Sequence, residues 1–213
     1  YPEAVAQLGV LLKDFPEGNQ RADALLLAGE CQYLSKNWKE SLVHFEMVVA
    51  DKNATERSRA LYRSGTCHLN LKQWPQAQQR FEALLKEFPK YPQLFAARYG
   101  LGLALQKQGQ LARALVVFEE VTKETNTEAA AKARFMIGEI AFSKKQYKVA
   151  YSSFLVAAFK YPYEEWQAKG DLEAGRCFKE LKDHDKAREL LETVVKKFPK
   201  RPEAKSGAQV LTT

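Results

Sequence analysis

Histidines and cysteines are the side chains of this chain best suited to bind a metal ion or to attack a substrate. They are His44, His68 and His184, and Cys31, Cys67 and Cys177. A structural zinc site needs paired Cys or His ligands at short spacing, and the sequence has no such pair. Three cysteines cannot all pair, which argues against a disulfide framework. We therefore expect packed or exposed imidazoles and buried thiols rather than a metal site.

Other motifs that could carry chemistry are incomplete. Residues 100–102, Gly-Leu-Gly, match the start of a dinucleotide-binding loop, but a third Gly and a preceding strand are missing. Adjacent acids at 119–120 and 164–165 are neighbours in sequence and are expected on solvated helix surfaces. The sequence contains neither a nucleophile elbow nor a phosphate-binding loop. We expect no catalytic site and no cofactor.

Composition and charge describe an ordinary folded chain with a basic excess. The 213 residues are 46% apolar and 28% charged, a balance typical of globular proteins. The net charge is +7, and the basic residues are spread along the chain apart from a cluster at residues 196–205. Nucleic-acid-binding proteins concentrate such charge on one face, so we expect no nucleic-acid partner. No apolar run is long enough to span a bilayer.

A repeat of 36 or 37 residues organises the whole chain. Each copy has a Gly, a small residue five before it, a mostly aromatic residue nine after it, another small residue twelve after it and a large apolar residue sixteen after it. The glycines are Gly29, Gly65, Gly102, Gly138 and Gly175, and the small residues five before them are Ala24, Ala60, Ala97, Ala133 and Gly170. The mostly aromatic residues nine after the glycines are Trp38, Trp74, Leu111, Tyr147 and His184. The small residues twelve after them are Ser41, Ala77, Ala114, Ala150 and Ala187, and the large apolar residues sixteen after them are Phe45, Phe81, Phe118, Phe154 and Leu191. Five columns that hold through five copies indicate one structural unit in tandem.

Apolar residues within each copy follow helical spacing in two segments. In the second copy these segments cover residues 60–69 and 76–85, with a short polar turn between them. An aromatic residue followed by Pro closes several copies, as at 88–89 and 161–162, because Pro cannot continue a helix. The pattern predicts pairs of antiparallel helices, and the Gly and Ala columns allow the two helices of a pair to approach closely.

The columns divide the chain into five full repeats and a leading half repeat. We expect one all-α solenoid with repeats at 22–57, 58–94, 95–130, 131–167 and 168–204. Residues 1–21 are expected to form the second helix of a truncated repeat, with Tyr1 in the aromatic column, and residues 205–213 to begin a further truncated first helix. Because solenoids end in capping repeats, we expect a fragment of a longer protein, whose open apolar ends could associate with another copy.

These columns resemble the tetratricopeptide repeat, whose pattern is an aromatic residue or Leu, Gly, a further aromatic residue, Ala, Phe and a closing Pro. The resemblance covers essentially the whole chain, although Arg98, Arg134 and Asp171 replace an early apolar residue of the pattern. It implies a right-handed superhelical solenoid of antiparallel helix pairs that binds proteins or peptides on a concave face. The repeat length and loop style are similar to bacterial cell-envelope members, including the Tol–Pal-associated periplasmic protein and the lipoprotein of outer-membrane barrel assembly.

The resemblance also implies which side chains line the groove. Family groove positions lie six and three residues before each repeat glycine and one residue after it. In this chain we select from these columns Leu26, Glu30, Arg59, Tyr62, Thr66, Tyr99, Leu103, Lys132, Phe135, Glu139, Lys169, Leu172 and Arg176. Chaperone-binding members carry Lys and Asn three before and one after the glycine to clamp a carboxylate, and this chain does not. What remains is an apolar, partly aromatic surface with mixed charges, suited to an amphipathic helix or an extended segment.

The aromatic members of this surface allow two interpretations. Tyr62, Tyr99 and Phe135 either face a partner or pack between adjacent first helices. In the first case, Tyr62→Ala combined with Tyr99→Ala is expected to abolish partner capture and leave helicity intact.

A non-catalytic scaffold for a protein or peptide partner is the favoured function. The alternative is a scaffold segment of a larger enzyme or membrane-anchored protein whose activity lies outside these residues. Loop style favours the bacterial periplasm or envelope assembly, whereas the three cysteines favour a reducing compartment such as the cytoplasm.

Overall fold

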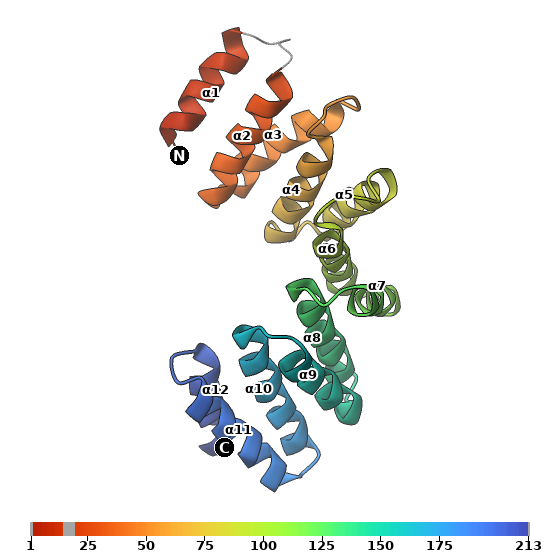
Figure 1. Ribbon diagram of the computed structural model, residues 1–213, viewed down its shortest axis with the longest axis vertical. Coiled ribbons are helices and arrows are strands. Elements are labelled where there is room, and N and C mark those ends of the chain that lie inside the picture. Colours follow the sequence, from red (N-terminus) through yellow and green to blue (C-terminus); the bar gives the residue numbers. More distant parts are fainter. Residues whose placement is uncertain (1, 15–19, 213) are drawn as a thin grey trace. The chain divides into compact units, whose positions relative to one another are not determined.

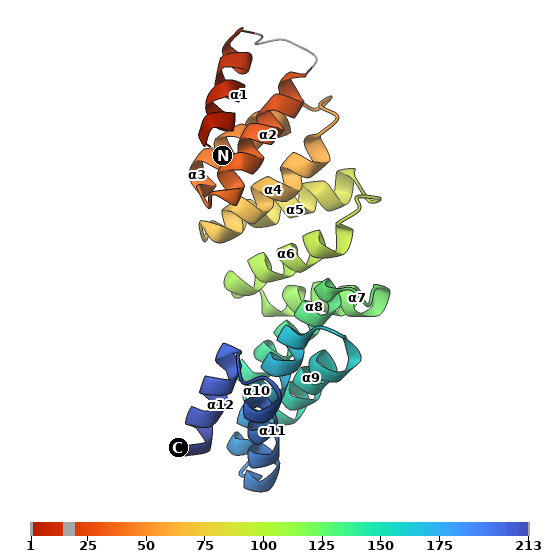
Figure 2. The same cartoon turned by 60° about the vertical axis from the view of Figure 1, so that its left-hand side comes forward.

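The computed structural model describes residues 2–14 and 20–212, and this part of the chain folds into helices without a strand. Figures 1 and 2 show the helices as successive hairpins. Their bounds are α1 Pro2–Asp14, α2 Arg21–Leu34, α3 Trp38–Ala50, α4 Arg57–Asn70, α5 Trp74–Glu87, α6 Leu94–Lys107, α7 Leu111–Glu124, α8 Glu128–Ser143, α9 Tyr147–Lys160, α10 Glu164–Glu180, α11 His184–Lys197 and α12 Pro202–Thr212. The predicted all-α class is confirmed.

The helices group into two compact units, Tyr1–Gln110 and Leu111–Thr213. Within each unit every helix packs against the next one along the chain. The first helices of successive hairpins also touch, since α4 contacts α6 and α10 contacts both α8 and α12. The division between the units falls inside the expected repeat 95–130, and the repeat boundaries stay a prediction.

The repeat columns form the core of both units. The small and large apolar residues of the columns are buried, and the Phe residues of the last column are almost fully enclosed. A Cβ placed on Gly29 would lie 2.6 Å from the ring of Phe45, and one on Gly65 would lie 2.8 Å from the ring of Phe81. At these two positions glycine is therefore explained by ring packing between the two helices of a hairpin, and at Gly175 the corresponding contact is with the side chain of Leu191 at 2.9 Å.

The mostly aromatic column begins the second helix of each hairpin, and the aromatic–Pro pairs end it. Helices followed by such a pair end one residue before the aromatic residue, at Glu87, Lys160 and Lys197. Tyr1, which is predicted to lie in the aromatic column, is outside the described residues, and so is the further aromatic–Pro pair Phe15-Pro16.

A left-handed residue closes the first helix of each hairpin. These residues are Lys36, Lys72, Gly109, Lys145 and Lys182, with φ between 57° and 76°. In the second hairpin the amide of Lys72 donates to the carbonyl of Leu69 at 3.1 Å, and the amide of Gln73 donates to that of His68 at 2.9 Å. This pair of hydrogen bonds satisfies carbonyls at the helix end, and it fixes the turn that reverses the chain.

Glu46 ties two neighbouring hairpins of the N-terminal unit together. Its carboxylate, on α3, accepts hydrogen bonds from Arg80 Nε at 2.8 Å and Arg80 Nη2 at 2.6 Å, and also from the hydroxyl of Ser64. His68 Nε2 lies 3.6 Å from Glu46 Oε1. Burial alone would raise the pKa of Glu46, but hydrogen bonds from His68, Arg80 and Ser64 lower it to about 2.

Candidate functional site

The first helices of the hairpins in the C-terminal unit line a cavity of about 410 Å³ that is open to solvent. Its walls come from α8, from α10 and from the first two turns of α12, which Figures 1 and 2 show in the green-to-blue part of the chain. The lining residues are Phe135, Met136, Glu139, Trp166, Lys169, Leu172, Glu173, Arg176, Pro202, Glu203 and Ser206. Ligand pockets in proteins are commonly about 300–1,000 Å³, so the cavity has room for side chains of a partner.

The floor of the cavity is aromatic. The ring of Phe135 lies 5.0 Å from that of Phe154 and 5.5 Å from that of Trp166, measured between centroids. Phe135, Trp166 and Leu172 are each buried. Trp166 Nε1 donates to Glu128 Oε1 at 3.2 Å, which holds the indole in place. The floor is therefore an extension of the core and is preorganised.

Charged side chains surround this floor. Arg176 Nη1 lies 2.7 Å from Glu173 Oε1. Burial raises the pKa of Glu173; Arg176 opposes this increase, and the negative charge of Glu139 adds to it. Lys169 forms an ion pair with Glu165, and its ammonium lies 4.5 Å from the centroid of the Trp166 ring. Both acidic and basic groups thus surround an apolar centre.

The wall from α12 is also charged. Glu203 is buried and accepts a hydrogen bond from Arg201 Nε at 3.3 Å. The same guanidinium lies 3.8 Å from Glu164 and 3.9 Å from Glu165, measured between nitrogen and oxygen. Arg201 therefore links the start of α12 to the start of α10.

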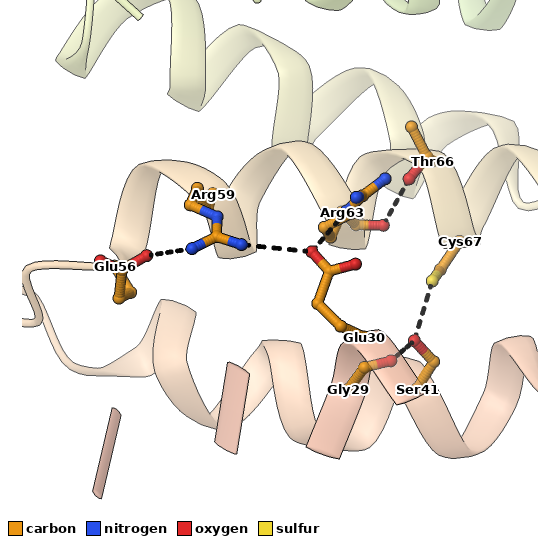
Figure 3. A network of polar contacts seen from close by, with 8 residues as sticks. All are labelled: Gly29, Glu30, Ser41, Glu56, Arg59, Arg63, Thr66 and Cys67. Carbon is orange, nitrogen blue, oxygen red and sulfur yellow. Dashed lines mark hydrogen bonds and ion pairs between the residues drawn. The ribbon is translucent and has the colours of Figure 1, made fainter. Parts of the chain in front are cut away.

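The equivalent surface of the N-terminal unit carries an ion-pair network (Figure 3). Arg63 Nε donates to Glu30 Oε1 at 2.7 Å, and Arg59 Nη2 lies 3.8 Å from the same oxygen. Arg59 also pairs with Glu56 at 3.1 Å. The Arg63 guanidinium lies 4.6 Å from the centroid of the Tyr33 ring. Glu30 is thereby held between two arginines from α4.

Aromatic side chains of this unit are partly in the core. The Tyr62 ring is half-buried, and its centroid lies 6.3 Å from that of Phe81 and 5.8 Å from that of Tyr91. Burial raises the pKa of Tyr62. Both interpretations of the aromatic column therefore apply to Tyr62, which packs against neighbours and keeps one part of its surface accessible.

The structure brings together five of the thirteen predicted groove residues around the cavity. They are Phe135, Glu139, Lys169, Leu172 and Arg176. Lys132, on the same face of α8, pairs with Glu128 at 3.2 Å instead. The remaining seven belong to the N-terminal unit: Leu26 is buried, Glu30 and Arg59 share the ion-pair network, Thr66 donates to the Arg63 carbonyl at 2.8 Å, and Tyr62, Tyr99 and Leu103 are half-buried.

Comparison with known families identifies the repeat. Two overlapping matches to a tetratricopeptide-repeat profile cover residues 62–129 and 99–165, and another tetratricopeptide-repeat profile matches 171–201. The chain belongs to the tetratricopeptide-repeat family. A comparison of its sequence with curated proteins finds no match.

Solved structures with similar folds support this assignment. The quorum sensor NprR from B. thuringiensis, in its apo form, superposes with a TM-score of 0.78 at 16% identity, over 97% of this chain and 62% of that one. PilW, a type IV pilus biogenesis factor, gives 0.75 at 19% identity, over 97% and 90%. YrrB, described as a tetratricopeptide-repeat protein with an unusual peptide-binding site, gives 0.65 at 18% identity, over 92% and 96%. At these identities the likeness shows the fold.

Six lining residues of this tetratricopeptide-repeat chain were missed from sequence. They are Met136, Trp166, Glu173, Pro202, Glu203 and Ser206. Met136 and Glu173 share a column two residues before the repeat glycine, and Arg63 occupies the same column in the N-terminal unit. The column three before is largely buried at Leu26, Phe135 and Leu172, so its neighbour presents more side chain to solvent. The sequence signal for Met136 and Glu173 was therefore the burial of the column three residues before the glycine, which leaves the next position along the helix to line the surface.

The histidines and cysteines of this chain are explained by packing and by local hydrogen bonds. His68 Nδ1 lies 2.7 Å from Gln73 Oε1, and His44 Nδ1 lies 3.0 Å from the Glu40 carbonyl oxygen. Burial raises the pKa of Cys67 to about 11 and that of Cys177 to about 12, so neither is a reactive thiolate at neutral pH. Over residues 2–14 and 20–212, no three His, Cys, Asp or Glu side chains are placed to hold a metal ion.

Helix length and hydropathy also bear on membrane spanning. None of the helices within the described part of the chain combines the length and the apolar character needed to cross a bilayer.

Proposed function

We propose that this chain is a non-catalytic interaction scaffold that binds a peptide or protein segment across α8, α10 and α12. The observation that carries the proposal is the cavity of about 410 Å³, where three first helices bring a fixed aromatic floor and a charged rim together. Aromatic residues and arginines at such a centre are the residue types that contribute most to binding energy at interfaces. YrrB, the structural neighbour described as having a peptide-binding site, supports the same class of ligand.

A bacterial cell-envelope assembly process is the setting that we propose for this scaffold. The loop style of the repeats supports it, and so does the similarity in fold to PilW, described as a type IV pilus biogenesis factor. The buried thiols Cys67 and Cys177 are compatible with this setting, because burial protects them from oxidation.

A steric block of the cavity tests the proposal. Random dodecapeptides displayed on phage are selected on the native chain, and the enriched peptides are then measured against Ser206→Trp and Ser152→Trp. Ser206 lines the cavity, whereas Ser152 is exposed on the second helix α9 of the same unit. We expect the first variant to lose binding of the selected peptides and the second to keep it.

Circular dichroism of both variants provides the control for folding. Equal binding of the selected peptides by a folded Ser206→Trp variant would place the binding surface elsewhere and refute the proposal. This block is cleaner than Tyr62→Ala, because the Tyr62 ring packs against Phe81 and Tyr91 and its removal would also cost stability.

A further inference from the structure

Phe159, in the last turn of α9, is exposed at a place where packing does not require an aromatic side chain. It is 72% exposed, the largest fraction among the large apolar residues within the described part of the chain. Its position lies twenty-one residues after the repeat glycine, and the same position of the preceding and following second helices carries Lys123 and Lys196. The side chains of these lysines are 75% and 76% exposed. The column therefore faces solvent, and an aromatic residue in it is available to a partner.

The loops that follow α9 and α11 lie side by side. Lys160 is the last residue of α9, and α10 begins at Glu164. In the loop after α11, the guanidinium of Arg201 lies 3.8 Å from the Glu164 carboxylate, measured between nitrogen and oxygen. We call the surface formed by residues 159–165 and 196–205 the closing edge of the C-terminal unit.

The closing edge is basic after its ion pairs are subtracted. Its three carboxylates all lie within 3.9 Å of the Arg201 guanidinium, and they belong to Glu164, Glu165 and Glu203. Lys196 pairs with Glu192 at 2.9 Å, and Lys197 acts on the buried carboxylate of Asp171. Among the residues that the structure describes, no carboxylate pairs with the three lysines that remain, which are all exposed: Lys160, Lys200 and Lys205.

Unpaired lysines beside exposed apolar side chains suit the surface of an anionic membrane. Its negative potential attracts the lysines, and the boundary between headgroups and acyl chains accepts an aromatic ring. Pro162 and Pro199, exposed in the two loops, extend the apolar surface and lack a backbone N–H. An acidic peptide would pair with the lysines alone, and a nucleic acid would gain no phosphate contact from the prolines. A lipid surface uses both parts of the closing edge.

We propose that the closing edge docks the C-terminal unit on an anionic lipid surface. Phe159 enters the boundary between headgroups and acyl chains, and the headgroups bind Lys160, Lys200 and Lys205. None of these four side chains lines the cavity. The docking is therefore a further function, independent of peptide binding in the groove.

Co-sedimentation of the full 213-residue chain with lipid vesicles tests the docking. One kind of vesicle contains equal parts of phosphatidylglycerol and phosphatidylcholine, and the other contains phosphatidylcholine alone. The buffer contains about 0.1 M NaCl, where the Debye length is about 10 Å. We expect the chain to bind the mixed vesicles, less tightly as the salt concentration rises, and not to bind pure phosphatidylcholine.

A lysine on the closing edge and one far from it distinguish docking from general attraction. Lys200→Gln is expected to lower the partition coefficient between mixed vesicles and solution about fivefold, the effect of one lysine near an anionic surface. Lys148 is exposed near the start of α9, twelve positions before Lys160. That separation is about 18 Å at about 1.5 Å per residue, which exceeds the Debye length. We therefore expect Lys148→Gln, with the same change in net charge, to leave the partition coefficient within about twofold of the native value.

A second matched pair tests the apolar contact. Phe159→Ser is expected to lower the partition coefficient about tenfold, since the burial of the ring is lost. Val116, on α7 of the same unit, is 57% exposed, and Val116→Ser is expected to have no effect. All four substitutions replace exposed side chains, and circular dichroism verifies that the variants are folded.

Three results would overturn the docking: equal binding to both kinds of vesicle, absence of binding to the mixed vesicles, or equal effects of each substitution and its control. Fluorescein-labelled polyglutamate and oligothymidylate, measured by anisotropy in the same buffer, represent the other classes of anionic partner. If either of them bound the native chain and depended on Lys200 and Phe159 while the vesicles did not bind, the closing edge would serve an acidic protein or a nucleic acid, and the proposal would be wrong.

Discussion

Replacement of Gly138 by Ala tests how the repeat glycines support the hairpins and the floor of the cavity. A Cβ at this position would lie 2.6 Å from Cε1 and 2.7 Å from Cδ1 of Phe154. Phe154 is almost completely buried, and its ring packs on that of Phe135, so it has no free space to move into. The added methyl group must therefore displace a ring that supports the site.

The expected magnitude follows from two opposing effects. Ala is favoured over Gly in a helix interior by about 1 kcal/mol. Overpacking of a filled core costs about 1–3 kcal/mol, and a contact of 2.6 Å to a rigid ring belongs in the upper part of that range. We expect a net loss of about 1–2 kcal/mol in the free energy of unfolding, or about 2–4 °C in Tm for each kcal/mol.

Urea unfolding followed by far-UV circular dichroism measures this loss. Gly9→Ala is the matched control, since Gly9 lies in α1 and, apart from its own stretch of helix, nothing packs within 4 Å of the added Cβ. Its expected change is a gain of up to about 1 kcal/mol in the free energy of unfolding. Adding Phe154→Leu to Gly138→Ala should cost less than the sum of the two single changes, because the smaller side chain makes room. A Gly138→Ala variant as stable as the native chain would refute the packing argument.

Three further predictions concern charged groups and a turn. Glu46 has a pKa of about 2 in the folded state against an ordinary 4.5, so its contribution to stability is present above pH 4.5 and is lost as pH falls towards 2. In urea titrations, Glu46→Gln should lower the free energy of unfolding by about 1–2 kcal/mol at pH 7, after allowance for partial exposure, and by less at pH 3. Burial raises the pKa of Asp171 to about 6 from an ordinary 3.8, so this side chain destabilises the fold as pH rises through 6. In the same assay, Asp171→Asn should raise the free energy of unfolding by about 1–2 kcal/mol at pH 8 and by little at pH 4. An equal increase at both pH values would contradict this prediction. Lys72 holds φ at 58°, so Lys72→Gly should raise Tm in a thermal melt, by the equivalent of up to about 1 kcal/mol, whereas Lys72→Val should lower it.

The fold could be predicted because its determinants are local and repeated. The Gly and Phe columns specify which faces of the two helices meet, and closing prolines mark where the second helix ends. The four lysines among the turn residues were not recognised, since Lys has no intrinsic preference for the left-handed region. Their positive φ values follow from the helix-ending hydrogen bonds of the hairpin, as at Lys72, and not from the residue type.

The candidate site could be predicted only in part, because a cavity depends on the register between helices as well as on the side chains present. The period alternates between 36 and 37 residues, and extending it from Lys132 and Lys169 leads to Lys205. In the structure Gly207 faces the carbonyl of Leu191 as Gly170 faces that of Phe154, which is a shift of 37. The counterpart of Lys169 on α12 is therefore Ser206. A short side chain here, where the two preceding helices carry Lys, leaves space at the wall of the cavity, and this makes Ser206 the position at which an added side chain most directly closes the site.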